Sequence, residues 1–173
     1  MTEAPFRLTL LDAAVDRSTF NSGSEALDRY FREQVTQDVR RRVTACFVAL
    51  AQGSRVAGYY TLASASLLLA DLPAATAVKL PRYPTVPTVP TVRMGRLAVD
   101  QEFKGQGLGG ALLADALDRA SQSEIAADAL MVDAKDEAAT AFYQHHGFIT
   151  LPDSPRTLFL PLATIQALRQ VDK

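Results

Sequence analysis

The sequence MGRLAVDQEFKGQGLGG, residues 94–110, contains an apolar segment, a short turn and a run of closely spaced glycines. Met94–Val99 is predicted to form a buried strand, Asp100–Lys104 a turn, and Gly105–Gly110 the entry to a helix. That helix has an apolar face made of Leu112, Leu113, Ala116, Leu117 and Ala120. A strand that passes through glycines into a helix exposes backbone N–H groups where the helix dipole favours negative charge, so the passage is a predicted phosphate site.

The order of the glycines argues against two common nucleotide-binding motifs. Dinucleotide-binding folds need G-x-G-x-x-G within a βαβ unit, whereas the order from Gly105 is G-x-G-x-G-G. The sequence contains no Gly-Lys-Ser or Gly-Lys-Thr, so it has no P-loop. An enzyme that uses nicotinamide or a nucleoside triphosphate is therefore disfavoured.

The first 70 residues predict a strand, a helix and a hairpin. Phe6–Leu11 is an apolar strand, and Ser22 with Glu25 three residues later matches a capping box. The predicted helix has one apolar face, formed by Leu27, Tyr30, Phe31, Gln34, Val35 and Val39. Val43–Ala51 and Val56–Leu69 predict an antiparallel hairpin, so the fold class is α/β, of the mixed α+β type.

The second half of the chain alternates short strands and helices. Asp71–Val92 contains Pro-Thr-Val three times, which excludes helix and predicts an extended connector. Strands are predicted at 129–132, 148–151 and 158–160. Helices are predicted at 136–146, capped by Asp136 and ended by Gly147, and at 163–171.

Composition limits the class of protein. The 173 residues predict a single domain, 1–173, and 48% apolar residues with a net charge of −1 fit a globular chain. Cys46 is the only cysteine, which excludes an intramolecular disulfide and a cysteine metal cluster. No apolar run is long enough to span a membrane, and the N-terminal residues lack a signal-peptide pattern, so we expect a cytoplasmic location.

The charge is unevenly distributed along the chain. Residues 29–104 carry 11 Lys and Arg against 5 Asp and Glu, although the chain as a whole is nearly neutral. A basic segment of this kind suits a surface that contacts nucleic acid or phosphate, and it equally suits ordinary solvated helix faces.

Two motifs resemble the GCN5-related N-acetyltransferase (GNAT) family. The pyrophosphate motif of that family, Q/R-x-x-G-x-G/A, matches Lys104–Gly109, with lysine in place of Gln or Arg. A helix that ends in an aromatic pair before a glycine matches Phe142–Phe148. The resemblance implies the GNAT fold: a central, mostly antiparallel sheet, splayed at the acetyl-CoA site and flanked by helices.

Within this family the chain is most similar to acetyltransferase toxins of toxin-antitoxin pairs. Phe20–Arg42, Val56–Ala63 and Gly95–Asp100 are the segments that resemble them. The resemblance implies transfer of acetyl from acetyl-CoA to the α-amino group of aminoacyl-tRNA, which blocks translation. It also implies a ribbon-helix-helix antitoxin and, as a further expectation, a homodimer.

The resemblance assigns roles to residues of this chain. The backbone of Leu97, Ala98 and Val99 would pair with the pantetheine arm. The pyrophosphate would bind the passage formed by Lys104, Gly105, Gln106, Gly107, Leu108, Gly109 and Gly110. Tyr143 is the expected acid for the leaving thiolate, because a phenol with a pKa of about 10 stays protonated at neutral pH.

The strand before the glycines offers no carboxylate as a general base. An α-amine, with a pKa of about 7.7 to 8.0, is partly neutral without one, whereas a lysine ε-amine is almost fully charged. This favours an α-amino acceptor. The residues expected to face tRNA are Arg40, Arg41, Arg42, Arg82, Arg93 and Arg96, drawn from a wider pool that includes Arg29, Arg32 and Lys79.

No metal is expected, because His145 and His146 have no further ligand at metal-binding spacing and are predicted to lie at a helix end. Two alternatives to the toxin stay open. One is a GNAT enzyme that acetylates a small amine or a protein N-terminus. The other is a CoA-binding domain that docks a partner.

Overall fold

The computed structural model describes residues 5–77 and 88–171. Seven strands in these residues form one sheet of order β1-β2-β3-β4-β5-β7-β6. The strands are β1 (Arg7–Leu10), β2 (Ala45–Leu50), β3 (Val56–Leu68), β4 (Thr88–Val99), β5 (Ala129–Asp133), β6 (Ile149–Leu151) and β7 (Ser154–Pro161). The helices of four or more residues are α1 (Glu25–Arg29), the π-helical η1 (Tyr30–Gln34), α2 (Val35–Arg40), α3 (Ala74–Ala77), α4 (Leu108–Gln122), α5 (Glu137–His145) and α6 (Leu162–Val171).

The chain divides into two compact units. Unit 1 comprises residues 1–63 and 95–116, and unit 2 comprises residues 64–94 and 117–173. The pairs β1/β2 and β2/β3 in unit 1 are antiparallel, as expected for the hairpin. In unit 2, β4 runs parallel to β5, while β7 is antiparallel to both β5 and β6. The mixed, mostly antiparallel sheet flanked by helices confirms the predicted fold class.

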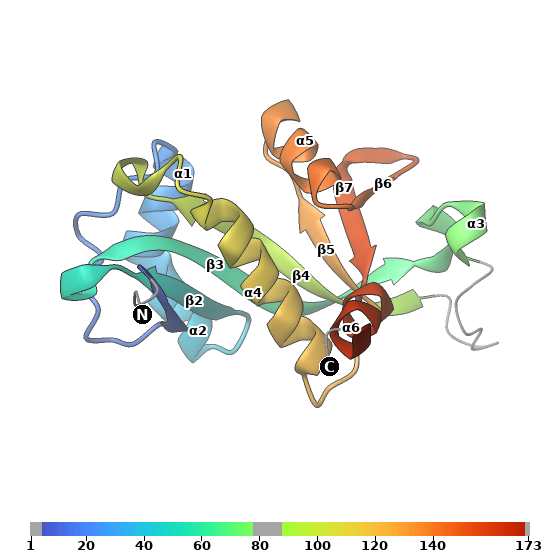
Figure 1. Cartoon of the computed structure of the whole chain (residues 1–173), viewed down its shortest axis with the longest axis horizontal. Helices are drawn as coiled ribbons and strands as arrows, with labels where there is room; N and C mark the ends of the chain where they lie inside the picture. The colour runs from blue at the N-terminus through green and yellow to red at the C-terminus, as the bar shows by residue number, and fades with distance from the viewer. Residues whose placement is uncertain (1–4, 78–87, 172–173) are drawn as a thin grey trace. The chain divides into compact units, whose positions relative to one another are not determined.

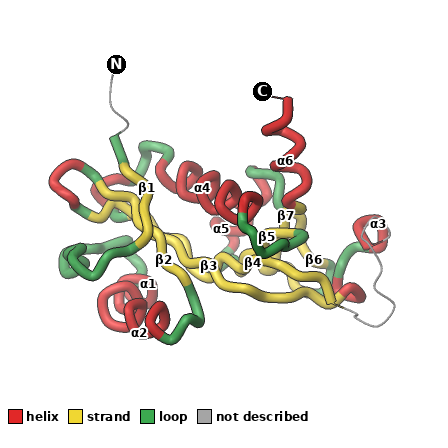
Figure 2. Tube along the Cα trace, turned by 90° about the horizontal axis from the view of Figure 1, so that it is seen from below, coloured by secondary structure: helices red, strands yellow, loops and turns green. Residues whose placement is uncertain are grey.

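In unit 1 the sheet lies between α1 to α2 on one face and α4 on the other (Figures 1 and 2). Consecutive residues of a strand point to opposite faces, and Tyr59 and Tyr60 of β3 show this directly. The Tyr59 hydroxyl donates to Leu27 O of α1 at 2.7 Å, whereas the Tyr60 hydroxyl donates to Asp115 of α4. Both tyrosines are fully buried.

Aromatic packing holds α1 and η1 on the sheet. The Phe31 ring stacks on Tyr59 with centroids 4.3 Å apart, and Phe20 meets both rings edge to face. On the opposite face Gly58 lets α4 approach closely, because a Cβ at this position would come within 2.8 Å of Leu112 Cδ1 of that helix. The predicted apolar face of α4 is confirmed, since all five of its residues are buried.

Unit 2 has its own apolar core, formed by Leu67, Leu72, Val89, Ala129, Met131, Leu151 and Phe159. Asp136 caps α5 as predicted, because its carboxylate accepts from Ala139 N at 2.8 Å. Gly147, with φ +91°, ends the same helix, and Phe148 N donates back to Tyr143 O at 3.1 Å. The left-handed conformation at this position explains the glycine.

The predicted start of the first helix is wrong in detail. Ser24, rather than Ser22, is the N-cap, and its hydroxyl accepts from Leu27 N at 3.4 Å. Ser22 instead donates to the carboxylate of Asp28. The predicted apolar face fails at Gln34, which is exposed because η1 inserts a π-helical turn and shifts the phase of the helix.

The proline-rich segment differs from its prediction at both ends. Ala74–Ala77 forms a short helix where helix was excluded, because Pro73 stands directly before the helix and does not interrupt it. The third Pro-Thr-Val repeat lies inside β4, where Pro90 is exposed. Pro90 still contributes its carbonyl, which accepts from Asp128 N at 2.8 Å. The first repeat lies outside the described residues.

Among the residues described, no helix is long and apolar enough to cross a bilayer.

Candidate functional site

The glycine passage of unit 1 opens α4 in the manner of an anion site. Gly105 and Gly107 have φ of +82° and +78°, which side chains other than glycine rarely adopt. A Cβ on either glycine would meet no protein atom within 4 Å, so the space beside the loop is open. The helix begins with the bond from Ala111 N to Gly107 O at 3.1 Å.

The backbone donors of this loop are not used by the part of the chain that the structure describes. The backbone N–H groups of Gly105 to Gly110 donate no hydrogen bond to any described residue. They stand at the N-terminus of a 15-residue helix, where the helix dipole adds positive potential. Unpaired donors, positive potential and glycines without side chains together fit a pyrophosphate group.

The predicted pantetheine strand also belongs to unit 1. Leu97 and Val99 are half-buried in β4, and Ala98 between them is buried in the core of this unit. The parallel pairing of β4 with β5 runs from Thr91 to Met94 among the described residues and does not include residues 95–99. A strand without a partner on one side can pair with an extended ligand through its backbone.

A buried carboxylate fixes the turn between β4 and the glycines. Asp100 is 2% exposed and accepts from Asn21 N at 3.0 Å and from Glu102 N at 2.9 Å. The Arg55 guanidinium lies 3.7 Å from the same carboxylate. Sequence reasoning missed Asp100 as an anchor, because its partner Asn21 is 79 positions away in the chain.

Tyr143 lies in unit 2, near the end of α5. It is 6% exposed, and its ring packs against Phe142 and Phe148. Burial raises the pKa of the phenol above its ordinary value of 10, and the negative charge of Asp133 raises the pKa further. Tyr143 therefore keeps its proton at neutral pH, as a proton donor requires.

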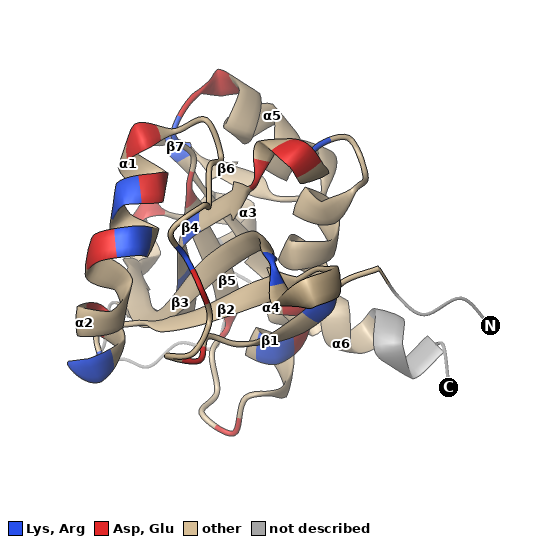
Figure 3. Cartoon of the chain, turned by 90° about the vertical axis from the view of Figure 1, so that its left-hand side faces the viewer, with Lys and Arg blue, Asp and Glu red and all other residues tan. Residues whose placement is uncertain are grey.

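The basic residues divide into free and engaged groups. Arg40, Arg41 and Arg42 are exposed at the end of α2 and form no ion pair with any described residue. Figure 3 shows that Lys and Arg alternate with Asp and Glu along this helical segment and that its end is basic. Arg42 adopts a left-handed φ of +62°.

Other predicted contact residues already have partners. The Arg96 guanidinium lies 3.4 Å from the centroid of the Tyr30 ring, whose hydroxyl donates to Asp38 at 2.8 Å. Burial, followed by the hydrogen bond to Asp38, raises the pKa of Tyr30 to about 12. Arg93 pairs with Asp133 at 3.5 Å. Arg82 and Lys79 lie outside the described residues.

Two further arginines of the pool have local partners. Arg29 pairs with Glu25 at 3.2 Å, and Arg32 donates to Phe20 O at 2.9 Å. His145 and His146 lie exposed at the end of α5, as predicted. No group of three His, Cys, Asp or Glu suited to a metal occurs among the residues described.

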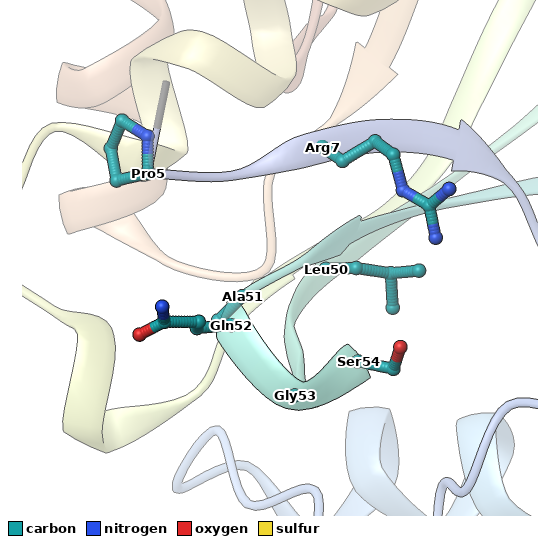
Figure 4. Close-up of a pocket in the computed structure, with 7 residues that line it drawn as sticks. All are labelled: Pro5, Arg7, Leu50, Ala51, Gln52, Gly53 and Ser54. Atoms are coloured by element: carbon teal, nitrogen blue, oxygen red, sulfur yellow. The ribbon is translucent and has the colours of Figure 1, made fainter. Parts of the chain in front are cut away.

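An open cavity of about 480 Å³ lies at the β2–β3 turn of unit 1 (Figure 4). Pro5 and Arg7 line one side, and residues 50–54 line the other. None of the predicted site residues belongs to it. We assign the cavity no role in the chemistry, because its described lining offers the Arg7 cation and the Ser54 hydroxyl but no general base beside them.

Comparison with known proteins agrees with this geometry. A family model described as Acetyltransferase (GNAT) domain matches residues 18–158. A tRNA-acetylating toxin of Mycobacterium tuberculosis is 36% identical over 167 residues, which are 95% of this chain and 95% of that protein.

Two solved structures of AtaT are similar over almost the whole chain. AtaT complexed with acetyl-methionyl-tRNAfMet has a TM-score of 0.86 and 29% identity, and the match covers 94% of this chain and 98% of that one. A tyrosine-to-phenylalanine mutant of the AtaT toxin, bound to the C-terminus of the antitoxin AtaR and acetyl-CoA, has a TM-score of 0.80 and 26% identity. That match covers 95% of this chain and 98% of the other.

Proposed function

The chain belongs to the GNAT family of acetyltransferases, and from this we propose that it is a toxin that acetylates aminoacyl-tRNA. Acetyl-CoA is the donor, and the α-amino group of the aminoacyl moiety is the acceptor. The observation that carries the acceptor is the 36% identity to a tRNA-acetylating toxin across 95% of both chains. Since the family model spans parts of both units, we take residues 1–173 as one acetyltransferase domain.

Different groups of residues serve different steps of the acetyl transfer. The free N–H groups of Gly105 to Gly110 bind the pyrophosphate, and the backbone of Leu97 to Val99 aligns the pantetheine arm. A backbone N–H of this strand polarises the thioester carbonyl, and one such donor is worth about 3 to 4 kcal/mol in the transition state. As the new C–N bond forms and the C–S bond breaks, Tyr143 gives its proton to the departing thiolate.

The role of Tyr143 is supported by its motif and by its protonation. It occupies the aromatic position of the family motif at the end of α5. Its raised pKa keeps the proton available. AtaT was itself studied as a tyrosine-to-phenylalanine mutant, which fits a functional tyrosine in that relative.

The nature of the acceptor explains the lack of a general base in β4. Residues 94–97 are Met, Gly, Arg and Leu, none of which can take a proton at neutral pH. An α-amine with a pKa of about 7.7 to 8.0 is sufficiently deprotonated to attack unaided. Acetylation then caps the amine and prevents peptide-bond formation, which would stop translation.

The proposal includes a protein partner. AtaT binds the C-terminus of an antitoxin, AtaR. By analogy this chain would be neutralised by an antitoxin of the ribbon-helix-helix type and would act as a homodimer. With charged tRNA as its acceptor, the site of action is the cytoplasm.

The experiment that tests this function is acetyl transfer from radiolabelled acetyl-CoA to a pool of charged tRNA. Uncharged tRNA, a peptide with a free N-terminus and a small amine are assayed beside it. We expect label on charged tRNA alone. Faster labelling of the peptide or of the small amine would favour the alternative enzyme, and acetyl-CoA binding without labelling of any acceptor would favour a docking domain.

The exposed arginines at the end of α2 give a prediction about tRNA binding. Arg41→Glu with Arg42→Glu should raise the KM for charged tRNA about tenfold or more, because two phosphate contacts are replaced by repulsion. The slope of log KM against the logarithm of salt concentration should decrease by about one for each lost phosphate contact. Steady-state kinetics from 50 to 300 mM salt measure both effects.

The matched control reverses the same amount of charge elsewhere. Arg7 and Arg156 are exposed in β1 and β7, and Arg7→Glu with Arg156→Glu should leave the KM near the wild-type value. Equal losses in both double variants would mean that overall charge matters and that α2 does not provide the tRNA contact.

A further inference from the structure

The segment Asn21–Gly23 fits tightly against the turn that leads into the glycine loop. Gln101 N donates to Asn21 O at 2.9 Å, and Asn21 N donates to the Asp100 carboxylate at 3.0 Å. Gly23 has φ +91°, and a Cβ there would come within 2.5 Å of the Gln101 amide nitrogen. These contacts all lie within unit 1 and join residues about 80 positions apart.

The side chain of Lys104 extends this contact to the loop itself. Its ammonium donates to Ser22 O at 2.7 Å, although Lys104 as a residue is exposed. Ser22 in turn donates twice to Asp28, from its N–H at 2.9 Å and from its hydroxyl at 2.7 Å. Asp28 is 4% exposed and Ser22 6% exposed, so this connection is shielded from water.

The connection runs from the glycine loop to the first helix. Asp28 belongs to α1, so the order is Lys104, Ser22, Asp28 and the helix. A buried carboxylate that accepts two hydrogen bonds fixes the peptide of Ser22, and the Ser22 carbonyl then fixes the lysine. Charge-assisted bonds of this kind are stronger than neutral ones.

Within the described residues, the loop beyond Lys104 is otherwise held by backbone hydrogen bonds at its two ends. At its start Lys104 N donates to Gln101 O at 3.4 Å, a long bond, and at its end Ala111 N donates to Gly107 O. Between these bonds lie Gly105 and Gly107, which have the most backbone freedom of any residue type. The lysine side chain is therefore the strongest anchor at the start of the loop.

We propose that Lys104 is a positioning residue that acts through Ser22 and Asp28 to preorganise the glycine loop for acetyl-CoA. This inference rests on the proposed acetyl-CoA site. The pyrophosphate is held by backbone N–H groups, and the lysine ammonium faces the protein. A loop already ordered in its binding conformation loses less entropy when the ligand binds, so breaking the anchor weakens binding.

Calorimetric binding to the whole chain tests the proposal with two ligands, acetyl-CoA and acetylpantetheine, which lacks the phosphates. Lys104→Met, Asp28→Asn and Ser22→Ala should each weaken acetyl-CoA binding about three- to tenfold, with acetylpantetheine unaffected. Lys104→Arg, which keeps the positive charge, should retain most of the wild-type affinity for acetyl-CoA. Arg7→Met, which removes one positive charge from the same unit, is the control and should bind as the wild type does.

The double variant Lys104→Met with Ser22→Ala separates positioning from direct contact. If the lysine acts through Ser22, the double variant loses no more than the worse single variant. Losses that multiply, or a loss in Lys104→Met without any in Ser22→Ala and Asp28→Asn, would assign the lysine to the phosphates and overturn the proposal. Thermal denaturation identifies any variant that fails to fold. If Lys104→Met or Asp28→Asn does not fold, the acetyl-CoA affinity of Ser22→Ala, the mildest change, decides the test.

A wild-type chain that does not bind acetyl-CoA contradicts the proposed function first, and the positioning role with it. Wild-type binding with unchanged affinity in all three single variants contradicts the positioning role alone.

Discussion

Tyr143→Phe should lower kcat for acetyl transfer to charged tRNA about 10²- to 10⁴-fold, the usual contribution of a positioned general acid. The substitution removes one oxygen atom and keeps the buried ring, so packing against Phe142 and Phe148 is retained. Affinity for acetyl-CoA should stay within about twofold, because the phenol serves the leaving group and not the pyrophosphate. Single-turnover kinetics and calorimetry measure the two quantities separately.

Tyr59→Phe provides the matched control for this experiment. Tyr59 is also buried with a raised pKa, caused mainly by burial, and its hydroxyl donates to Leu27 O at 2.7 Å. Its loss should reduce the free energy of unfolding by about 0.5 to 1.5 kcal/mol and leave kcat intact. If Tyr143→Phe keeps more than a third of the wild-type kcat, the phenol is a packing residue and the acid lies elsewhere.

The pH profile gives a second view of the same residue. Since burial and Asp133 both raise the pKa of Tyr143, the acid stays protonated throughout the neutral and mildly alkaline range. The rate should therefore rise with pH as the acceptor amine loses its proton, near pH 7.7 to 8.0, and then reach a plateau. A fall below pH 9 would point to an acid with a lower pKa.

Local patterns predicted the parts of the fold that depend on neighbours in sequence. The apolar face of α4, the Asp136 cap and the Gly147 terminus each follow from residues within one or two helical turns. The β2–β3 hairpin also followed from two apolar runs joined by a short turn. In the two helices the residues that set the structure lie within about ten positions of one another, and in the hairpin the paired residues are at most 17 positions apart.

Three predictions about single residues failed for reasons that residue type and helical period do not reveal. Ser22 matched a capping box, yet its hydroxyl is taken by the buried Asp28. Gln34 fitted the helical period until a π-helical turn shifted it. Arg96 looked like a surface cation, but the Tyr30 ring, 66 positions earlier, lies beneath its guanidinium. Periodicity carries no information about a π-helical turn or about which side chains pair in the folded chain.

The candidate site shows the same division. The glycine spacing predicted the loop, because the backbone freedom of glycine follows from the residue type alone. The anchors of that loop, Asp100 and the Lys104–Ser22 contact, depend on a segment about 80 residues away and gave no local signal. A lysine next to a predicted phosphate site invites assignment to the phosphate, and only the geometry shows that its ammonium is engaged by the protein.

Gly107→Ala should weaken acetyl-CoA binding about a hundredfold or more while costing the fold only about 1 to 2 kcal/mol. The stability cost comes from placing a Cβ at φ +78°, since no protein atom lies within 4 Å of it. The binding cost arises because the methyl group enters the open space beside the N–H donors. Losing two charge-assisted hydrogen bonds of about 1.5 kcal/mol or more each accounts for that factor.

Gly53→Ala is the matched control, because it should lose the same stability as Gly107→Ala without losing affinity for acetyl-CoA. Gly53 lies in the β2–β3 turn with φ +77°, and a Cβ there also meets no atom within 4 Å. The two variants should therefore lose the same stability in chemical denaturation, whereas only Gly107→Ala should lose affinity in calorimetry. Equal affinities would show that the glycine loop does not contact the phosphates. Because backbone strain is matched, any difference in binding between the variants reports the ligand and not the fold.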